Sequence, residues 1–331
     1  MNRLLTIAIP TYNREEALVA TLESFFALGI GEDVEIVVLD NASSDGTSAA
    51  LSEYSSRLTI VRQPYNLGIE GNIIEALRCG NSHYVWAVSD HMVFQAKGVQ
   101  DLLEVLPRND FDVGYAGIVD YGPLALPVAD PFFARDLEAR RIGEMLFCVS
   151  NLSGVIVARA HVEATIRQVY RFSGITYPNL GVYTRVYEDA RCRYFPGCTR
   201  FRSDIGTAKI TNKGYNTLVA RFHDFTIAVR LVVPRPWRKR AIAGATSKLQ
   251  FLSALRQELE QCLDLPAMSG IGGASLVFRV NPGPVRALVL LFVVARCVRR
   301  VGGQSVSRLL FVRPSHILVR GWNKLNSWWR S

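Results

Sequence analysis

Short apolar runs alternate with amphipathic stretches along the first 95 residues of the chain. The apolar runs have strand length and are rich in β-branched residues; they cover residues 4–9, 34–39, 58–61 and 84–88. The amphipathic stretches carry apolar residues at helical spacing and cover residues 15–28, 48–54 and 71–79. Apolar strands that alternate with helices are typical of βαβ units, in which helices cover both faces of a parallel sheet. The sequence therefore predicts an α/β domain with a Rossmann-like, mostly parallel sheet.

The pattern becomes less regular after residue 95 and changes character near residue 212. Further strands are predicted at 111–119, 153–158 and 193–196, a long loop at 120–144 and a helix at 177–190. Past residue 212 helical patterns follow, at 218–233, 241–263 and 285–300. We therefore expect the α/β domain to cover residues 1–205 and a helical C-terminal extension to cover residues 206–331.

A polar cluster follows three of the predicted strands. The clusters are Thr11-Tyr12-Asn13, the turn-forming segment 40–47 and Ser89-Asp90-His91. Parallel strands place their carboxyl ends at one edge of a sheet, where open α/β folds bind ligands. Asp40 and Asp90 should therefore converge on one crevice, which is the geometry of a nucleotide site. A simpler alternative is that Ser89 and Asp90 cap the following helix.

Four ordered segments carry a recognisable pattern: IAIPTYNR, EIVVLDNASSDGT, NLGIEGN and the strand that ends in an acid, Asp90. Over about the first 95 residues the chain resembles the inverting nucleotide-sugar glycosyltransferases of family 2, which have the GT-A fold. The resemblance implies a hexosyl- or deoxyhexosyltransferase in cell-surface polysaccharide synthesis. Such an enzyme moves a sugar from a nucleoside diphosphate to a hydroxyl of a glycan or lipid-linked glycan. Residues 1–95 would then bind the nucleotide sugar and residues 96–205 the acceptor.

The resemblance assigns nucleotide-sugar-binding roles to the residues that match the family pattern. They are Pro10, Thr11, Tyr12, Arg14, Asp40, Asn66, Gly68, Asn72 and Asp90. Residues 10–12 would line the base and ribose pocket, Asp40 would accept from the nucleobase, and Arg14 would reach the diphosphate. Residues 66–72 would shape the wall near the ribose and diphosphate. Simpler roles stay open, because Asp40 can cap its own turn and Arg14 can be a solvated arginine.

The segment Asp90-His91-Met92 stands where the family usually has an acidic triplet that binds ribose and a divalent cation. Mg²⁺ and Mn²⁺ prefer oxygen ligands, which Met92 cannot supply, whereas the imidazole of His91 suits Mn²⁺ better than Mg²⁺. Asp90 and His91 are therefore the expected catalytic residues and metal ligands. Two alternatives stay open: a metal-independent transfer in which His91 or an arginine counters the phosphate, and a site that no longer catalyses.

The general base is not assigned by the sequence. In the family an acidic pair near the start of a helix supplies it, and counting back from the strand at 193–196 puts Pro178-Asn179 there. Asparagine cannot act as a base. Glu188-Asp189 falls at the helix end and is interpreted as a pair of surface acids. Asp120 and His91 stay open as candidates.

The formal charge of +9 is concentrated in the C-terminal tail, where residues 265–331 carry ten Lys or Arg and no acid. Basic residues interleaved with Trp and Leu suit an anionic membrane surface, so we expect peripheral contact there. A helical cap with solvated arginines is the alternative, and no recognised nucleic-acid-binding motif accompanies the charge. The scattered cysteines and the short apolar runs predict a cytoplasmic protein, peripheral on the inner face of the plasma membrane.

Two other functions compete with sugar transfer. A non-catalytic binding or scaffold protein that keeps the fold is favoured by the altered triplet and the absent base. A nucleotidyltransferase would need a Gly-rich loop with Lys or Arg after the first strand, and the segment PTYNR does not supply one.

Overall fold

The computed structural model describes residues 3–202, except 32, 123, 125, 129, 139–140, 144, 147–150, 172–177 and 187–189, together with residues 233, 235–238 and 241. The predicted domain boundary at residue 205 and nearly all of the predicted helical extension lie outside the described residues. The division into 1–205 and 206–331 and the membrane contact of residues 265–331 therefore stay predictions. Among the helices that are described, none is long and apolar enough to cross a bilayer.

The described elements follow the predicted alternation of strands and helices in the first half of the chain. The strands are β1 (Leu5–Thr11), β2 (Val34–Asp40), β3 (Thr59–Arg62), β4 (Tyr84–Ala87), β5 (Met92–Phe94), β6 (Val113–Ile118), β7 (Phe132–Phe133), β8 (Val155–Ala158) and β9 (Arg191–Phe201). The α-helices are α1 (Glu15–Phe26), α2 (Thr47–Glu53), α3 (Gly68–Arg78), α4 (Ala96–Val105) and α6 (Arg159–Arg171). The 3₁₀ helices are η1 (Leu106–Arg108), η2 (Val119–Tyr121), η3 (Ala134–Asp136), η4 (Leu152–Gly154), η5 (Pro178–Arg185) and η7 (Arg235–Trp237).

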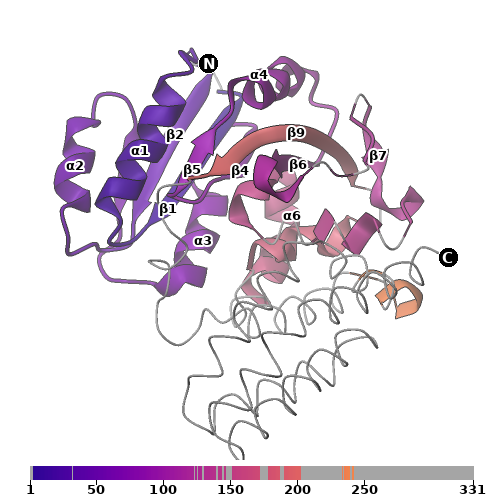
Figure 1. Ribbon diagram of the computed structural model, residues 1–331. Helices are drawn as coiled ribbons and strands as arrows, with labels where there is room; N and C mark the ends of the chain where they lie inside the picture. The colour runs from indigo at the N-terminus through magenta and orange to yellow at the C-terminus, as the bar shows by residue number, and fades with distance from the viewer. Residues whose placement is uncertain are drawn as a thin grey trace, which may run out of the picture. The chain divides into compact units, whose positions relative to one another are not determined.

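One sheet unites all the strands, in the order β3-β2-β1-β4-β8-β6-β9-β5, with β7 paired to β9 (Figure 1). β1 pairs in parallel with β2 and β4, and β2 pairs in parallel with β3. β8 is antiparallel to both β4 and β6, and β9 is parallel to β6. β1 to β4, β6 and β9 consequently run in one direction, against β5, β7 and β8. The predicted mostly parallel α/β sheet is confirmed.

β4 lies at the centre of this sheet, and its continuous apolar sequence explains why. Residues 84–88 are fully buried, as expected for a strand that is covered on both faces. On one face, alternate residues of β1 (Leu5, Ile7, Ile9) share a core cluster with Leu18 and Leu22 of α1. α3 packs against β1, β2 and β4, so the sheet carries helices on both faces.

The second half differs from its predicted elements. The strand expected at 193–196 is the middle of the longer β9, and the expected loop at 120–144 contains η2, β7 and η3. The helix predicted at 177–190 is the 3₁₀ helix η5 over Pro178–Arg185, whereas α4, α6 and β5 were not predicted. Close packing sets the position of η5, since a Cβ added to Gly181 would lie 2.4 Å from the Cα of Val169 on α6.

Arg159, the first residue of α6, joins this helix to the end of α3. Its guanidinium donates to the carbonyl oxygens of Leu77, Arg78 and Cys79 at 3.4, 3.1 and 2.7 Å. Such a charge at a helix C-terminus satisfies carbonyls that have no partner within the helix and complements the helix dipole. The second half of the domain is thereby held against the first.

The described cysteines are free thiols: Cys79, Cys192 and Cys198. Burial raises the pKa of the Cys79 thiol to about 12 and that of Cys192 to about 12 as well. These thiols are protonated at neutral pH, so they behave as small apolar side chains and not as nucleophiles.

Candidate active site

The predicted polar clusters lie together at the carboxyl edge of the parallel strands. Thr11 ends β1 and stands opposite Asp40, which ends β2. The Thr11 hydroxyl donates to Oδ2 of Asp90 at 2.8 Å, just beyond β4. The structure thus brings Asp40 and Asp90 to either side of Thr11, as the strand order requires.

Asp90 is contacted by three side chains at this edge. Its Oδ2 receives the Thr11 hydroxyl and lies 3.9 Å from Nε of Arg14, while its Oδ1 lies 3.3 Å from Nδ1 of His91. The Asp90 side chain is only 9% exposed, against 31% for Arg14 and 20% for His91. A nearly buried carboxylate between two cationic or potentially cationic groups is a favourable place for phosphate or cation chemistry.

The alternative in which Asp90 caps the following helix is wrong. The chain continues from Asp90 and His91 into β5, and α4 begins only at Ala96, after Gln95 at the N-cap position. The peptide N–H of Ser89 donates to Oγ of Ser153 at 3.0 Å, and the indole N–H of Trp86 donates to the Ser153 carbonyl at 2.8 Å. These two bonds to η4 fix the course of the chain where it leaves β4.

Met92, at the position where the resemblance places a carboxylate, lies in the core and not at the edge. Met92 is fully buried in the main hydrophobic cluster, because β5 pairs antiparallel with β9 and sets Met92 opposite Phe201. A carboxylate at position 92 would therefore point into the core and not into the site. His91 stays at the edge, where its ring lies parallel to that of Phe201 with centroids 6.1 Å apart.

The donor set around Asp90 fits a cation held by two protein ligands. The 3.3 Å between Oδ1 of Asp90 and Nδ1 of His91 is close to the separation of about 3 Å between neighbouring ligands of an octahedral ion with bonds of about 2.1 Å. In the part of the chain that the structure describes, no cluster of three or more His, Cys, Asp or Glu could hold a metal. The remaining ligands would have to be phosphate oxygens and water, as is common for Mg²⁺.

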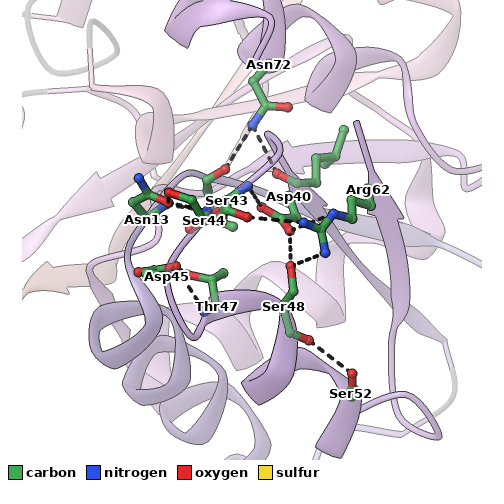
Figure 2. Close-up of polar contacts among 12 residues, drawn as sticks. Asn13, Asp40, Ser43, Ser44, Asp45, Thr47, Ser48, Ser52, Arg62 and Asn72 are labelled. Carbon is green, nitrogen blue, oxygen red and sulfur yellow. Dashed lines mark hydrogen bonds and ion pairs between the residues drawn. The ribbon is translucent and has the colours of Figure 1, made fainter. Parts of the chain in front are cut away.

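Asp40 is engaged by its own turn. The carboxylate is 1% exposed, and it accepts from the Ser43 N–H at 2.9 Å and from the Ser48 hydroxyl at 2.7 Å. Arg62 of β3 lies 3.9 Å from the same carboxylate and donates to Oγ of Ser48 and to the Ser43 carbonyl (Figure 2). The turn-capping role left open by the sequence is thus present. The contact of Asp40 with a nucleobase stays a prediction and would have to share the carboxylate with these donors.

The loops after β1 and β2 are joined to each other, and this joining positions Arg14. The Asn13 N–H donates to Oγ of Ser43 at 2.9 Å, and Oδ1 of Asn13 accepts from the Ser44 N–H at 2.8 Å. The Arg14 N–H donates to Oγ1 of Thr47 at 3.2 Å. Asn13 adopts φ 51°, a left-handed conformation that asparagine tolerates better than most residues. Thr47, the first residue of α2, therefore fixes the position of the Arg14 backbone, from which the Arg14 side chain extends.

Asp45 adds further hydrogen bonds between the loops after β1 and β2 (Figure 2). Although burial disfavours its charge, hydrogen bonds from the Thr47 side chain and from the backbone N–H groups of Thr47 and Glu15 lower the pKa of Asp45 below its ordinary value of 3.8. Asp45 is therefore ionised at neutral pH, next to the N-termini of α1 and α2, where a negative charge is stabilising.

Asn41, which the sequence reasoning missed, organises the turn before α3. Its Oδ1 accepts from the Leu67 N–H at 2.8 Å, and its side-chain amide donates to Oδ1 of Asn66 and to the Gly68 carbonyl. Gly68 has φ 76°, which a residue with a Cβ adopts only with strain. Asn66 and Gly68 thus serve this turn, and their predicted place beside a nucleotide stays a prediction. The position of Asn41 directly after a strand-ending acid was a usable signal.

Asn72 on α3 lies against the ends of β1 and β2. Its side-chain amide donates to the Leu39 carbonyl at 3.0 Å and to the Thr11 carbonyl at 3.5 Å (Figure 2). Its Oδ1 is buried without a hydrogen-bond partner. Buried acceptors are nearly always paired, so this oxygen is a place where a buried water could donate. Pro10 is half-buried in β1 opposite Leu39, and Tyr12 is 40% exposed beyond it.

The candidate positions for the general base differ in their exposure to solvent. Asn179 is 1% exposed inside η5, so this position supplies neither a base nor an accessible side chain. Glu188 and Asp189 lie outside the described residues. Asp120 is exposed at the end of β6, and its Oδ2 accepts from the Phe201 N–H at 2.7 Å.

Residues 6–127 match the family described as Glycosyl transferase family 2. This part of the chain is similar to a family 2 glycosyltransferase domain. The resemblance predicted from the motifs is confirmed, and the matched residues contain β1 except its first residue, β2 to β4 and the whole edge from Thr11 to Asp90. They also extend past β6 to include Asp120.

Two proteins illustrate the similarity in sequence. The chain is 35% identical over 92 residues to "Abequosyltransferase RfbV" of Salmonella typhimurium, which is 25% of this chain and 26% of that protein. It is 28% identical over 85 residues to Rv1520 of Mycobacterium tuberculosis, which is 24% of this chain and 25% of that protein. The similarity thus spans about a quarter of the length of these relatives.

Solved structures show that the fold is GT-A. TarS residues 1–349 of S. aureus superposes with a TM-score of 0.57 at 14% identity, over 94% of this chain and 90% of that chain. The mannosyltransferase PcManGT of Pyrobaculum calidifontis, solved with GDP-Man and Mn²⁺, has a TM-score of 0.52 at 15% identity, over 92% and 88% of the two chains. At these identities the likeness establishes the fold alone, and the predicted GT-A fold is confirmed.

Proposed function

We propose that this chain is an inverting glycosyltransferase. It transfers a hexose or deoxyhexose from a nucleoside-diphosphate donor to a hydroxyl of a glycan or lipid-linked glycan, in cell-surface polysaccharide synthesis. The observation that carries the proposal is the nearly buried carboxylate of Asp90, held by Thr11 and flanked by Arg14 and His91 at the carboxyl edge of a family 2 domain. This arrangement places the positive charge of Arg14, and a carboxylate that can hold a cation, where a diphosphate leaving group would be stabilised.

The relatives support a nucleotide-sugar donor. TarS has been crystallised with UDP-GlcNAc and PcManGT with GDP-Man, and RfbV is named as an abequosyltransferase. For this chain we propose that residues 10–12 and Asp40 line the base and ribose pocket, and that Asn66, Gly68 and Asn72 form the adjoining wall. The position of Asn72 supports this wall, because its side chain lies against the carbonyls of Thr11 and Leu39 at the ends of β1 and β2.

Asp90 and His91 would hold a Mn²⁺ or Mg²⁺ ion, which supplies positive charge to the departing diphosphate. Oδ1 of Asp90 is turned toward His91, while Oδ2 is already bound by Thr11 and faces Arg14. Thr11 therefore orients the carboxylate, and Arg14 adds a second, fixed positive charge next to the phosphates.

The reaction that this site suits is a single displacement. A base removes the proton of the acceptor hydroxyl, the acceptor oxygen bonds to C1 of the sugar, and the bond from C1 to the phosphate oxygen breaks. The electron pair leaves on the diphosphate, and attack from the opposite face inverts C1. The buried frame of β4, fixed through Trp86 and Ser153, keeps Asp90 in place during this step.

Donor binding and hydrolysis test the proposal. We expect at least one of UDP-glucose, UDP-GlcNAc, GDP-mannose and CDP-glucose, with Mn²⁺, to raise the melting temperature of the full chain. A ligand at 100 times its Kd adds about 2.7 kcal/mol of stability, which is several degrees. The same donor should be hydrolysed slowly, with release of the nucleoside diphosphate. A chain that binds a donor without ever hydrolysing it would support the scaffold function, which the buried Asn179 at the family's base position favours.

Asp40→Ala is expected to weaken nucleoside-diphosphate affinity about ten- to hundredfold, because it removes a charged hydrogen-bond acceptor worth about 1.5–3 kcal/mol. Its turn contacts are a complication, since Ser43 and Ser48 also lose their acceptor. Ser48→Ala is the matched control, because it disturbs the same turn but leaves the carboxylate. Isothermal titration on folded variants decides: equal affinities for Asp40→Ala and Ser48→Ala would remove Asp40 from the base pocket.

For the remainder of the chain the proposal rests on the amino-acid sequence. We propose that residues 265–331 contact the anionic cytoplasmic surface of the membrane, where the acceptor would be anchored. Ten basic residues, three Trp and the absence of any acid in this stretch support it.

A further inference from the structure

We propose that Asp120 is the general base of the transfer reaction, an assignment that rests on the function proposed above. Topology brings Asp120 to the site. β6 is antiparallel to β8, which is antiparallel to β4, so β6 and β4 run in the same direction. Asp120, in η2 directly after β6, therefore lies at the same edge of the sheet as Asp90, directly after β4.

A short series of contacts connects Asp120 to His91, one of the two proposed cation ligands. Oδ2 of Asp120 accepts from the N–H of Phe201 at 2.7 Å, and the Phe201 ring lies parallel to the ring of His91. The next residue, Arg202, donates its N–H to the His91 carbonyl at 3.3 Å. The end of β9 thus lies between Asp120 and His91, and it holds both in one frame.

The spacing of the strands matches the reaction geometry. β4 and β6 are separated by β8 alone, so the two strands lie two strand spacings apart, about 9–10 Å. An in-line displacement needs the leaving oxygen, C1, the acceptor oxygen and the oxygen of the base in a row. The bond from C1 to the leaving oxygen is about 1.5 Å long and the other two steps are about 3 Å each, so this row is about 7–8 Å long. An acid that follows β6 can therefore lie within reach of a sugar whose diphosphate is held near Asp90.

Asp120 is an accessible acid on this side of the site. Its side chain is exposed, and the neighbouring Val119 is 51% exposed, which offers an apolar surface to an acceptor. The acids on the preceding loop are engaged elsewhere: Asp110 pairs with Arg193 and Asp112 with Arg191. Asp40, at the end of β2, and Asp45, just before α2, lie on the opposite side of Asp90 and bond to residues of α2.

In the proposed step the Asp120 carboxylate takes the proton of the acceptor hydroxyl while the oxygen bonds to C1. The electron pair of the broken C1–O bond leaves with the diphosphate. The proton on Asp120 then passes to water, which restores the carboxylate for the next turnover.

Two substitutions of the full-length chain separate a base from a structural hydrogen bond. Asp120→Asn keeps an oxygen that can accept from the Phe201 N–H but cannot take a proton, whereas Asp120→Ala loses both functions. Asp136→Asn, an exposed acid after β7, is the matched control. The readouts are hydrolysis of the four donors named above, nucleoside-diphosphate affinity, and the rate with added sodium azide. Azide attacks C1 without needing deprotonation and forms a glycosyl azide.

We expect Asp120→Asn to lower the hydrolysis rate at least 100-fold, with nucleotide affinity unchanged within twofold and Asp136→Asn at the wild-type rate. Azide should raise the rate of Asp120→Ala at least tenfold and leave the wild type unchanged. Retention of more than a tenth of the wild-type rate by Asp120→Asn, or no azide rescue of Asp120→Ala, overturns the assignment. A wild type that hydrolyses none of the donors would overturn the proposed function itself, and the base with it.

Discussion

Replacing Asp90 by asparagine is expected to lower donor turnover about 100-fold or more. The change is nearly isosteric, and the side chain can still accept from the Thr11 hydroxyl, so the fold should be preserved. What is lost is the negative charge between Arg14 and His91, and with it the hard oxygen ligand for a cation. The melting temperature of the variant should stay within about 2 °C of the wild type.

The measurement is donor hydrolysis with EDTA, with Mg²⁺ and with Mn²⁺, beside direct titration of Mn²⁺ into the protein with a nucleoside diphosphate present. We expect the wild type to need millimolar Mn²⁺ or Mg²⁺, and His91→Ala to lose more activity with Mn²⁺ than with Mg²⁺, because a nitrogen ligand suits Mn²⁺ better. Asp101→Asn, a partly exposed acid of α4 paired with Lys97, is the control and should behave as wild type. Full activity of Asp90→Asn in EDTA would remove Asp90 from the cation site and would favour a transfer in which Arg14 alone counters the phosphate.

Trp86→Ala should cause the largest loss of stability, about 3–5 kcal/mol, which lowers the melting temperature by roughly 10 °C. Trp86 is the largest fully buried side chain of the described residues; it packs edge-on against Phe94 with ring centroids 5.4 Å apart. Its indole N–H is also a donor to the Ser153 carbonyl. Truncation leaves a cavity under β4 and a carbonyl without this partner.

Trp86→Phe isolates the hydrogen bond from the packing, and about 1–3 kcal/mol should be lost because most of the ring volume stays. Tyr65→Ala is the surface control: this side chain is 66% exposed, so its loss should change stability by less than about 0.5 kcal/mol. Urea denaturation of the full chain measures all three. Equal midpoints for Trp86→Ala and Tyr65→Ala would mean that β4 is not the centre of the stabilising core.

The elements from β1 to β4 were predictable from the sequence. Their apolar runs and the helices between them were predicted within a few residues, because each element is specified by a local pattern of period 2 or 3.6. The alternation of strand and helix also settled that the strands are parallel, and parallel strands must end at one edge. The convergence of Asp40 and Asp90 around Thr11 followed from these two facts without any contact being known.

Beyond β4 the local pattern no longer specified the arrangement. β8 has the same continuous apolar character as β4 but runs in the opposite direction, and no feature of its four residues records that. β5 is three residues long, and it exists because β9 offers it a partner. An element whose partner is distant in the chain is decided by long-range pairing, which a period in the sequence does not describe.

The site divides in the same way. The sequence by itself determined the family 2 motifs, the GT-A fold and the edge on which Thr11, Asp40 and Asp90 gather. Only the tertiary structure decided that Met92 enters the core, that the Asp40 carboxylate is bound by its own turn, and that the end of β9 lies between His91 and Asp120. Periodicity fixes which face of an element is apolar, whereas the partner of each polar atom depends on which distant strands lie side by side.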